Sequence, residues 1–283
     1  MAEQFDRDVV INIGGIEISS RGEESSRDLL KVTFDITKSL SKDPNTCDIQ
    51  VYNLSLPNRI ATQENRPEAS IIAGYVGATS ILFSGTLEFG STSKEGTDYV
   101  TSLQALDGTN RTKSKRINKS LRGPVRAGEV LRVAARELGL KPGNLKKAIK
   151  RGSVRGELRG YDTGIVLSGR ADRVLDSVCK SMGYFYSIQD GQLVLLTKDS
   201  FIGSTAALIS RETGMVGSPE PGDGGYVDVR SLIRPDLLPG HRVRIESNLV
   251  NGLFRVERVH FSGDTRGGDW FADLECSPVG GAR

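Results

Sequence analysis

The sequence predicts a mainly β protein that carries an α+β insertion. Three observations support this class: alternating apolar and polar residues fill the first hundred positions, a helical spacing replaces them in the middle, and alternation returns near the C-terminal end. Glycine, with 33 of 283 residues, exceeds its usual share of ~7%, whereas there are only 10 prolines. This composition favours many tight turns between short strands.

The first β region is expected to contain a hairpin and several further strands. The run from Val9 to Ile18 is apolar on alternate positions, and Gly14-Gly15 in its centre can adopt the positive φ that a hairpin turn needs. Ser55, just before Pro57, is placed to cap a short turn or helix. The other expected strands cover residues 30–36, 47–54, 69–75, 81–89 and 99–105. Strands at this spacing predict a closed or nearly closed antiparallel barrel, because closure removes exposed edges.

The middle of the chain predicts two helices and a hairpin. Apolar residues recur on one helical face over residues 127–138 and again over 170–182, and a glycine follows each segment as a stop signal. Residues 184–188 and 192–197 are expected to be strands joined at Asp190-Gly191, a strong hairpin signal. These elements together form the expected α+β module.

The last part of the chain returns to strands. Residues 214–225 are rich in glycine and proline and are interpreted as a loop or hinge. Strands are expected at 226–230, 241–246, 253–261 and 270–276. The predicted domains are therefore a first β-barrel domain over 1–110, a basic linker with the α+β domain over 111–213, and a second β-barrel domain over 214–283. Whether the two β regions form one barrel or two stays open.

The sequence lacks the residue patterns of several classes of catalytic and binding site. The three cysteines are far apart and show no zinc-binding or disulfide pattern, and the two histidines, His241 and His260, lie in expected strands where structural roles are common. No Gly-x4-Gly-Lys-Ser/Thr loop occurs. The uncharged stretch 69–87 is broken by three glycines, so we interpret it as two buried strands and not as a membrane span. We expect no catalytic residue, cofactor or metal ligand, and no secretion signal.

One segment is strongly basic. Residues 110–159 hold 16 lysines and arginines against three acidic residues, a local net charge of +13, whereas the rest of the chain has 22 basic and 32 acidic residues, a net charge of −10. Such a segment could bind nucleic acid, form a solvated face, or contact an acidic protein. It contains no aromatic residue for base stacking. The candidate partner-contact residues are Lys113, Lys115, Arg116, Lys119, Arg122, Arg126, Lys146, Lys147, Lys150, Arg151 and Arg155.

The order of several short motifs resembles the baseplate hub proteins of contractile phage tails and related injection systems, the group that includes the late control protein D family. The motifs are IQVYNLSLPNR (49–59), IAGYVGATSILFSG (72–85), VTSLQALDG (100–108), the helix and hairpin of 173–196, and LPGHRVRIES, NGLFRVERVHFSGDT and WFADLEC within 238–276. Each motif consists mainly of core and turn positions, and their shared order spans most of the chain.

The resemblance implies a structural virion protein without enzymatic activity. It implies a homotrimer with two related barrel domains per subunit, forming a pseudo-sixfold ring that adapts the sixfold tail tube to a threefold central spike during genome ejection. Closing such a ring requires heterologous contacts. The implied partners are a second and third copy of the chain, the tail tube protein, a spike that is expected to be a separate polypeptide, and baseplate wedge or other tail proteins. Assembly in the host cytoplasm is implied as well.

Two alternatives stay open at this point. The chain could be a nucleic-acid-binding β-barrel protein that uses residues 110–159, and a transient contact of the hub with genomic DNA is a weaker form of the same idea. A cell-wall-cutting enzyme with two carboxylates is a more distant alternative, because 35 acidic residues offer too many pairs to nominate one.

Overall fold

The computed structural model describes residues 7–20, 30–63, 66–107, 115–155 and 160–279. The chain divides into two compact units. Unit 1 comprises Met1–Ser39, Asn45–Asp107 and Gly203–Arg283, and unit 2 comprises Leu40–Pro44 and Gly108–Ile202. Unit 2 is therefore inserted into the sequence of unit 1.

Unit 1 is built almost entirely of strands. Its N-terminal region contains β1 (Arg7–Ile13), β2 (Ile16–Ser19), β3 (Val32–Ser39), β4 (Thr46–Tyr52), helix α1 (Leu56–Ala61), β5 (Glu68–Tyr75), β6 (Ala78–Glu95) and β7 (Asp98–Leu106). Its C-terminal region contains β14 (Ile202–Ser210), η1 (Arg211–Thr213), β15 (Met215–Pro221), η2 (Asp223–Gly225), β16 (Val227–Leu232), β17 (His241–Glu246), β18 (Asn251–Asp264) and β19 (Trp270–Pro278).

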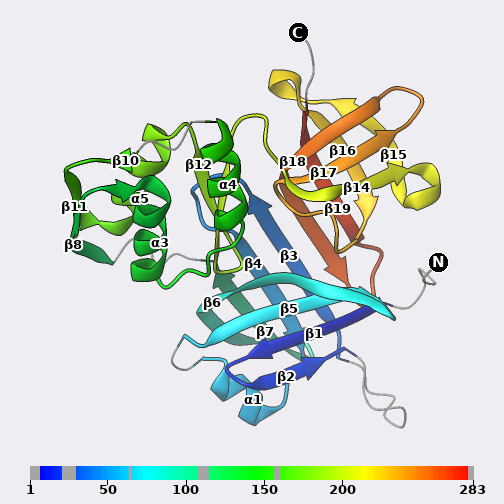
Figure 1. Cartoon of the computed structure of the whole chain (residues 1–283). Coiled ribbons are helices and arrows are strands. Elements are labelled where there is room, and N and C mark those ends of the chain that lie inside the picture. Colours follow the sequence, from blue (N-terminus) through cyan, green and yellow to red (C-terminus); the bar gives the residue numbers. More distant parts are fainter. Residues whose placement is uncertain (1–6, 21–29, 64–65, 108–114, 156–159, 280–283) are drawn as a thin grey trace. The chain divides into compact units, whose positions relative to one another are not determined.

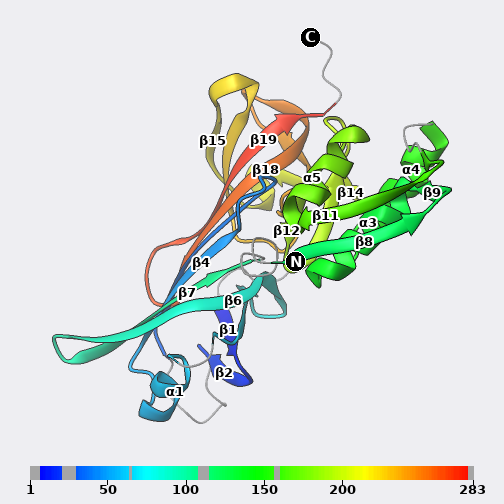
Figure 2. The ribbon, with the colours of Figure 1, turned by 90° about the vertical axis from the view of Figure 1, so that its left-hand side faces the viewer.

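All of these strands belong to one antiparallel sheet of 13 strands. The strand order is β15-β16-β19-β18-β3-β4-β7-β6-β5-β1-β2, and β17 pairs with both β14 and β18. The two β regions meet where β3 pairs with β18, from Thr33 opposite Asp264 to Ser39 opposite Arg258. Figure 1 shows these two strands side by side, with the blue and cyan strands in one half and the yellow and red strands in the other, and Figure 2 shows the same from the side. The predicted tandem β regions are thus joined edge to edge.

The core of unit 1 contains a cluster of aromatic side chains. Trp270 is only 1% exposed, and its ring meets those of Phe34 and Tyr75 edge to face at centroid distances of 5.5 and 6.3 Å. Such pairs add to the stabilisation that burial gives. The guanidinium of Arg7 lies 5.2 Å from the Trp270 ring centroid and covers the cluster. Phe34 and Trp270 come from opposite ends of the chain, so this cluster joins the two β regions as the strand pairing does.

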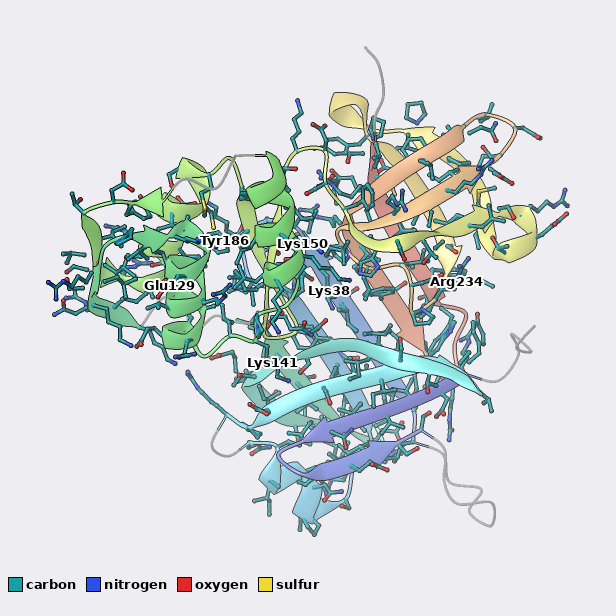
Figure 3. All side chains as sticks on the ribbon, viewed as in Figure 1. Lys38, Glu129, Lys141, Lys150, Tyr186 and Arg234 are labelled. Atoms are coloured by element: carbon teal, nitrogen blue, oxygen red, sulfur yellow. The ribbon has the colours of Figure 1, made fainter. Side chains whose placement is uncertain are left out.

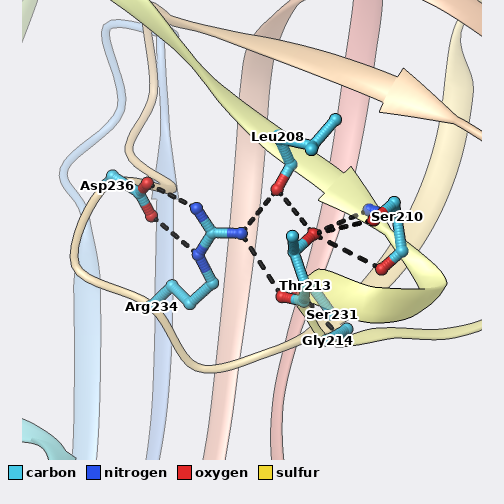
Figure 4. Close-up of polar contacts among 7 residues, drawn as sticks. All are labelled: Leu208, Ser210, Thr213, Gly214, Ser231, Arg234 and Asp236. Carbon is cyan, nitrogen blue, oxygen red and sulfur yellow. Dashed lines mark hydrogen bonds and ion pairs between the residues drawn. The ribbon is translucent and has the colours of Figure 1, made fainter. Parts of the chain in front are cut away.

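An arginine fastens the turn between β14 and β15 (Figure 4). Arg234 donates to the backbone carbonyl of Leu208 at 2.6 Å and to that of Thr213 at 3.4 Å, and it forms a bidentate pair with Asp236 at 3.1 and 2.6 Å. The Thr213 hydroxyl also donates to the Leu208 carbonyl at 2.8 Å. These bonds hold the turn against the segment that follows β16.

Unit 2 is a small α+β module. It contains β8 (Arg116–Arg122), β9 (Val125–Arg126), α3 (Ala127–Leu138), α4 (Leu145–Arg155), β10 (Gly160–Tyr161), β11 (Gly164–Arg170), α5 (Ala171–Ser181), β12 (Phe185–Gln189) and β13 (Gln192–Leu196). The strands form three two-stranded sheets, β8 with β11, β9 with β10, and β12 with β13. The helices and strands share one core, in which Leu131, Leu138 and Leu175 are fully buried. Burial raises the pKa of Tyr186 in this core to about 12.

The predicted class, mainly β with an α+β insertion, is confirmed. The Gly14-Gly15 and Asp190-Gly191 hairpins form as expected, with positive φ at all four residues. The helix predicted over 127–138 is α3, and Gly139 ends it in the left-handed conformation with φ 71°. Ser55 does precede α1, but its side chain makes no capping hydrogen bond. The predicted domain boundaries, 1–110, 111–213 and 214–283, stay a prediction.

Some expectations for individual segments were wrong. Residues 214–225 are not only a loop, because 215–221 form β15. A strand tolerates these glycines and prolines here because β15 lies at the end of the sheet and its register shifts between Val216 and Glu220. Strands β8, β11 and β14 and helix α4 were not predicted at all. Among the described side chains of helix α4, only Leu145, Ala148 and Ile149 are apolar, and they alternate with lysines.

Candidate interaction surface

Helix α4 presents the densest group of predicted contact residues. Leu145 and Ala148 are buried in the core of unit 2, and Ile149 packs against Gly128 of α3 so closely that a Cβ there would lie 2.7 Å from its Cδ1. Packing on this one side turns the other side of the helix to solvent. Lys146, Lys147 and Lys150 are all exposed on it (Figure 3 labels Lys150).

The charges of α4 work against its own helical stability. Its first turn contains two lysines and no acidic residue, although the positive end of the helix dipole favours acidic residues there. Lys146 and Lys150 are one turn apart, a spacing at which like charges destabilise a helix by about 0.2–0.5 kcal/mol. The side-chain amide of Asn144, directly before the helix, donates to the backbone carbonyl of Leu195 at 2.7 Å and accepts from the backbone N–H of Leu195 at 2.8 Å. Among the described residues none forms an ion pair with these three lysines. A one-sign face of this kind favours an anionic partner.

A second group of predicted residues lies on and around β8. Lys115, Arg116, Arg122 and Arg126 are exposed, and Arg116 and Arg122 share the outer face of the β8–β11 pair. Lys119 is also exposed but faces α3, where it pairs with Glu137 and holds the pKa of that carboxyl below its ordinary value. Lys119 is therefore partly engaged within the unit.

The basic residues thus fall into two groups within unit 2. Helix α4 contacts α3 and β13, whereas β8 contacts β11, α3 and α5. The structure brings Lys146, Lys147 and Lys150 together on one helix and leaves the β8 group on another element. Lys113 lies outside the described residues. Helix α4 includes Arg151 and Arg155, but the structure does not describe their side chains.

Unit 1 carries a polar face of opposite sign that the sequence analysis missed. A groove of about 610 Å³ lies on the face of strands β18, β3, β4, β7 and β6. Of the described residues that line it, four are aspartates and none is a lysine or an arginine. These aspartates are Asp35, Asp48, Asp264 and Asp269. The alternation of residues 30–36 and 47–54 placed Asp35 and Asp48 on polar positions, but only the strand order shows that they share one face.

The cysteine and histidine side chains, which could act as nucleophiles or bases, lie in environments that favour structural roles. The three cysteines are buried, and burial raises the pKa of each thiol, that of Cys179 to about 12. His260 hydrogen-bonds through Nε2 to Asp35 at 2.7 Å. Burial lowers the pKa of His241. Within the described ranges, no group of three or more His, Cys, Asp or Glu side chains is arranged for a metal ion, and no helix is long and apolar enough to cross a membrane.

Comparison with known protein families decides the class of the chain. The model of the family described as baseplate hub gp41 matches residues 9–276. The chain belongs to this family. The match includes both β regions and unit 2, so it covers the candidate surfaces on α4, on β8 and on the sheet. No curated protein matches the sequence.

Solved structures share the fold of this hub family member at low sequence identity. The 43 kDa tail protein of prophage MuSo2 from Shewanella oneidensis matches with a TM-score of 0.63 at 10% identity, covering 96% of this chain and 98% of the other. A tail protein from Neisseria meningitidis MC58 matches with a TM-score of 0.62 at 11% identity, covering 96% of each chain. The E. coli c3393 protein, a component of the type VI secretion system, matches with a TM-score of 0.56 at 10% identity, covering 95% of this chain and 76% of that protein. The fold is that of phage tail proteins.

Proposed function

We propose that this hub family member is the central hub of a phage tail baseplate, a homotrimeric adapter between the sixfold tail tube and a threefold central spike. The observation that carries the proposal is the family match over residues 9–276. The fold supports it, because β1–β7 and β14–β19 form two β regions within a single sheet. Three copies would present six such regions on one side while keeping threefold symmetry.

The mechanism of such an adapter is surface complementarity. Each subunit must contact the next through two different surfaces, since a ring of three cannot be closed by isologous pairs. The tail tube protein, the spike and wedge or other tail proteins would bind the faces that the ring leaves open. No bond is made or broken in this role, so we propose a non-enzymatic protein that is assembled in the host cytoplasm.

The oligomeric state tests this proposal. With a subunit mass of 30.6 kDa, a trimer has a mass of about 92 kDa. Sedimentation of the purified protein, and cryo-electron microscopy of tails that contain it, are expected to give three copies around the tail axis. A protein that is monomeric both in solution and in particles would contradict the adapter role.

Nucleic-acid binding is the second candidate, favoured by the unpaired lysines of α4. Phosphate binding by such lysines releases counterions, so the affinity would fall steeply with salt. Changing the set Lys113, Lys115, Arg116, Lys146, Lys147 and Lys150 to Gln would abolish it. Binding that is absent or insensitive to salt, measured by fluorescence anisotropy with single- and double-stranded DNA, would exclude this candidate.

A further inference from the structure

The acidic groove of unit 1 contains a pair of like charges in direct opposition. Asp35 of β3 lies opposite Asp48 of β4 in the antiparallel register, so both carboxylates project from the same face of the sheet. Like charges in this position destabilise a sheet. Asp35 accepts a hydrogen bond from His260, and Asp48 accepts one from the Gln104 amide at 3.0 Å. Both residues stay exposed, and neither forms an ion pair with a described lysine or arginine.

One row of residues runs across the groove from strand to strand. The register aligns Phe89, Gln104, Asp48, Asp35 and Ser262 on β6, β7, β4, β3 and β18. Phe89 ends the row with 58% of its surface exposed, so its ring is accessible for an apolar contact. Aromatic residues are enriched at protein contacts, and the acidic centre beside this ring is complementary to a cationic surface.

The same chain carries a surface that matches this row in charge and in size. At 1.5 Å per residue, the eleven residues of α4 extend about 16 Å, and five strands about 4.8 Å apart span about 19 Å. Lys146 and Lys150 are about 6 Å apart along the helix, close to the spacing of Asp48 and Asp35 on neighbouring strands. Like charges repel one another on each surface, and docking one surface on the other would reduce the repulsion in both.

The net charges of the two units agree with this match. Unit 2 contains 21 of the 38 basic and nine of the 35 acidic residues, a net charge of +12, which leaves unit 1 with 17 basic and 26 acidic residues, a net charge of −9. Complementary potentials of this kind steer association and fix its register. Because the two surfaces differ, contact between them is heterologous, as the closing of a ring requires.

We propose that helix α4 of one copy docks into the acidic groove of the next copy, with Lys146 and Lys150 facing Asp48 and Asp35. This inference rests on the proposed homotrimer and names the contact that closes it. The occupant of the groove is thus a second copy of this chain, and Phe89 lies where the apolar stems of the lysines can cover its ring.

Charge exchange tests the contact. An acidic-face variant, Asp35→Lys with Asp48→Lys, and a helix variant, Lys146→Glu with Lys150→Glu, are each expected to weaken trimer formation at least tenfold in sedimentation equilibrium. The four substitutions together restore the opposite charges and are expected to restore the trimer. A control variant, Glu17→Lys with Glu95→Lys, makes the same charge change at exposed sites outside the groove and is expected to trimerise as the wild type does.

Mixing the two double variants gives a sharper result. Their opposite surfaces match only between unlike partners, and three subunits cannot alternate. The mixture is therefore expected to form mixed species, beginning at about 61 kDa for two subunits, while a closed ring of three keeps one mismatched contact and is expected to be weaker than the wild-type trimer. Where the acidic-face variant does not fold, Asp35→Asn with Asp48→Asn removes the charge with the shapes kept and is expected to weaken the trimer less.

Three outcomes would overturn the inference. Trimers of wild-type strength in both double variants would show that the contact lies elsewhere, while the proposed homotrimer would stand. Loss of the trimer in both without recovery in the fourfold variant would show that the two surfaces do not face each other. Loss of binding to DNA or to another tail protein in the helix variant, with trimers intact, would assign α4 to that partner. A wild-type monomer, in contrast, would contradict the proposed function itself.

Discussion

The two units of the molecule differ in almost every physical respect. Unit 1 is a single large antiparallel sheet with a net charge of −9, and its core includes the only tryptophan of the chain. Unit 2 is a small α+β module with a net charge of +12 and a core of aliphatic residues and tyrosines. The formal net charge of +3 for the whole chain is thus the sum of two opposite charges, and it describes the surface of neither unit. The difference also means that separate probes can follow the two units.

The largest expected effect is the loss of the aromatic cluster in unit 1. Trp270→Ala removes a ring that is 1% exposed and packed on Phe34 and Tyr75, so we expect unit 1 to lose about 3–5 kcal/mol of stability. Urea unfolding followed by circular dichroism measures it. The helical signal, which comes mainly from unit 2, is expected to keep its midpoint. Trp270→Phe is the control and should cost less. Equal losses in both units would contradict the contrast between them.

The matching change in unit 2 is Leu131→Ala. Leu131 is buried in α3 at 1% exposure, and its truncation is expected to cost about 2–5 kcal/mol. The midpoint of the helical signal should fall, whereas the fluorescence of Trp270 should report an unchanged midpoint for unit 1. Val166→Ala, at a side chain exposed on β11, is the matched control with little effect. A parallel shift of the fluorescence would show that the units unfold together.

A smaller effect distinguishes stability from assembly. Lys146→Glu and Lys147→Glu place acidic residues in the first turn of α4, where the helix dipole favours them, so each is expected to stabilise unit 2 by about 0.3–1 kcal/mol. Thermal unfolding of the helical signal measures the gain. The Lys146→Glu variant is also expected to assemble less well, because Lys146 belongs to the proposed contact. Exposed Lys141→Glu, outside any helix, serves as a control for net charge. A loss of stability would show that these lysines support the free fold.

The smallest effect is the pH dependence from one histidine in unit 1. Burial lowers the pKa of His241, and the charges of Asp236 and Lys38 act on it in opposite directions. The unfolded chain therefore binds the proton more readily, so stability is expected to fall as the pH drops below about 6.5 and to stay constant, as far as this group is concerned, above it. Urea midpoints of the wild type and of His241→Gln, compared across this range, should differ in slope. Identical slopes would contradict the assignment.

Much of the fold could be predicted because its signals are local. The bounds of α3 and the two hairpins follow from apolar spacing and turn residues within a few positions of one another. Strand β15 and helix α4 escaped prediction because tertiary context overrides their composition. In β15 an edge position tolerates two prolines, and in α4 the packing of Ile149 on Gly128 stabilises a helix whose charges oppose it.

The candidate surfaces were predicted only in part for the same reason. The basic residues are neighbours in sequence, so a charge count finds them. Asp35 and Asp48 come from two strands, and Asp264 and Asp269 come from the opposite end of the chain. Their common face depends on the pairing of β3 with β18, a register between residues more than 200 positions apart that no local pattern encodes.

That pairing has a consequence for the synthesis of the protein. At about 5–20 residues per second, a ribosome needs roughly 10–45 seconds to pass from β3 to the end of β18. During this interval β4 can pair with one side of β3, while the other side stays an open edge that neighbouring nascent chains could occupy. Unit 2 emerges within the same interval and could already be folded. The speed of translation through the insertion therefore sets how long the half-built sheet is exposed to aggregation on a polysome.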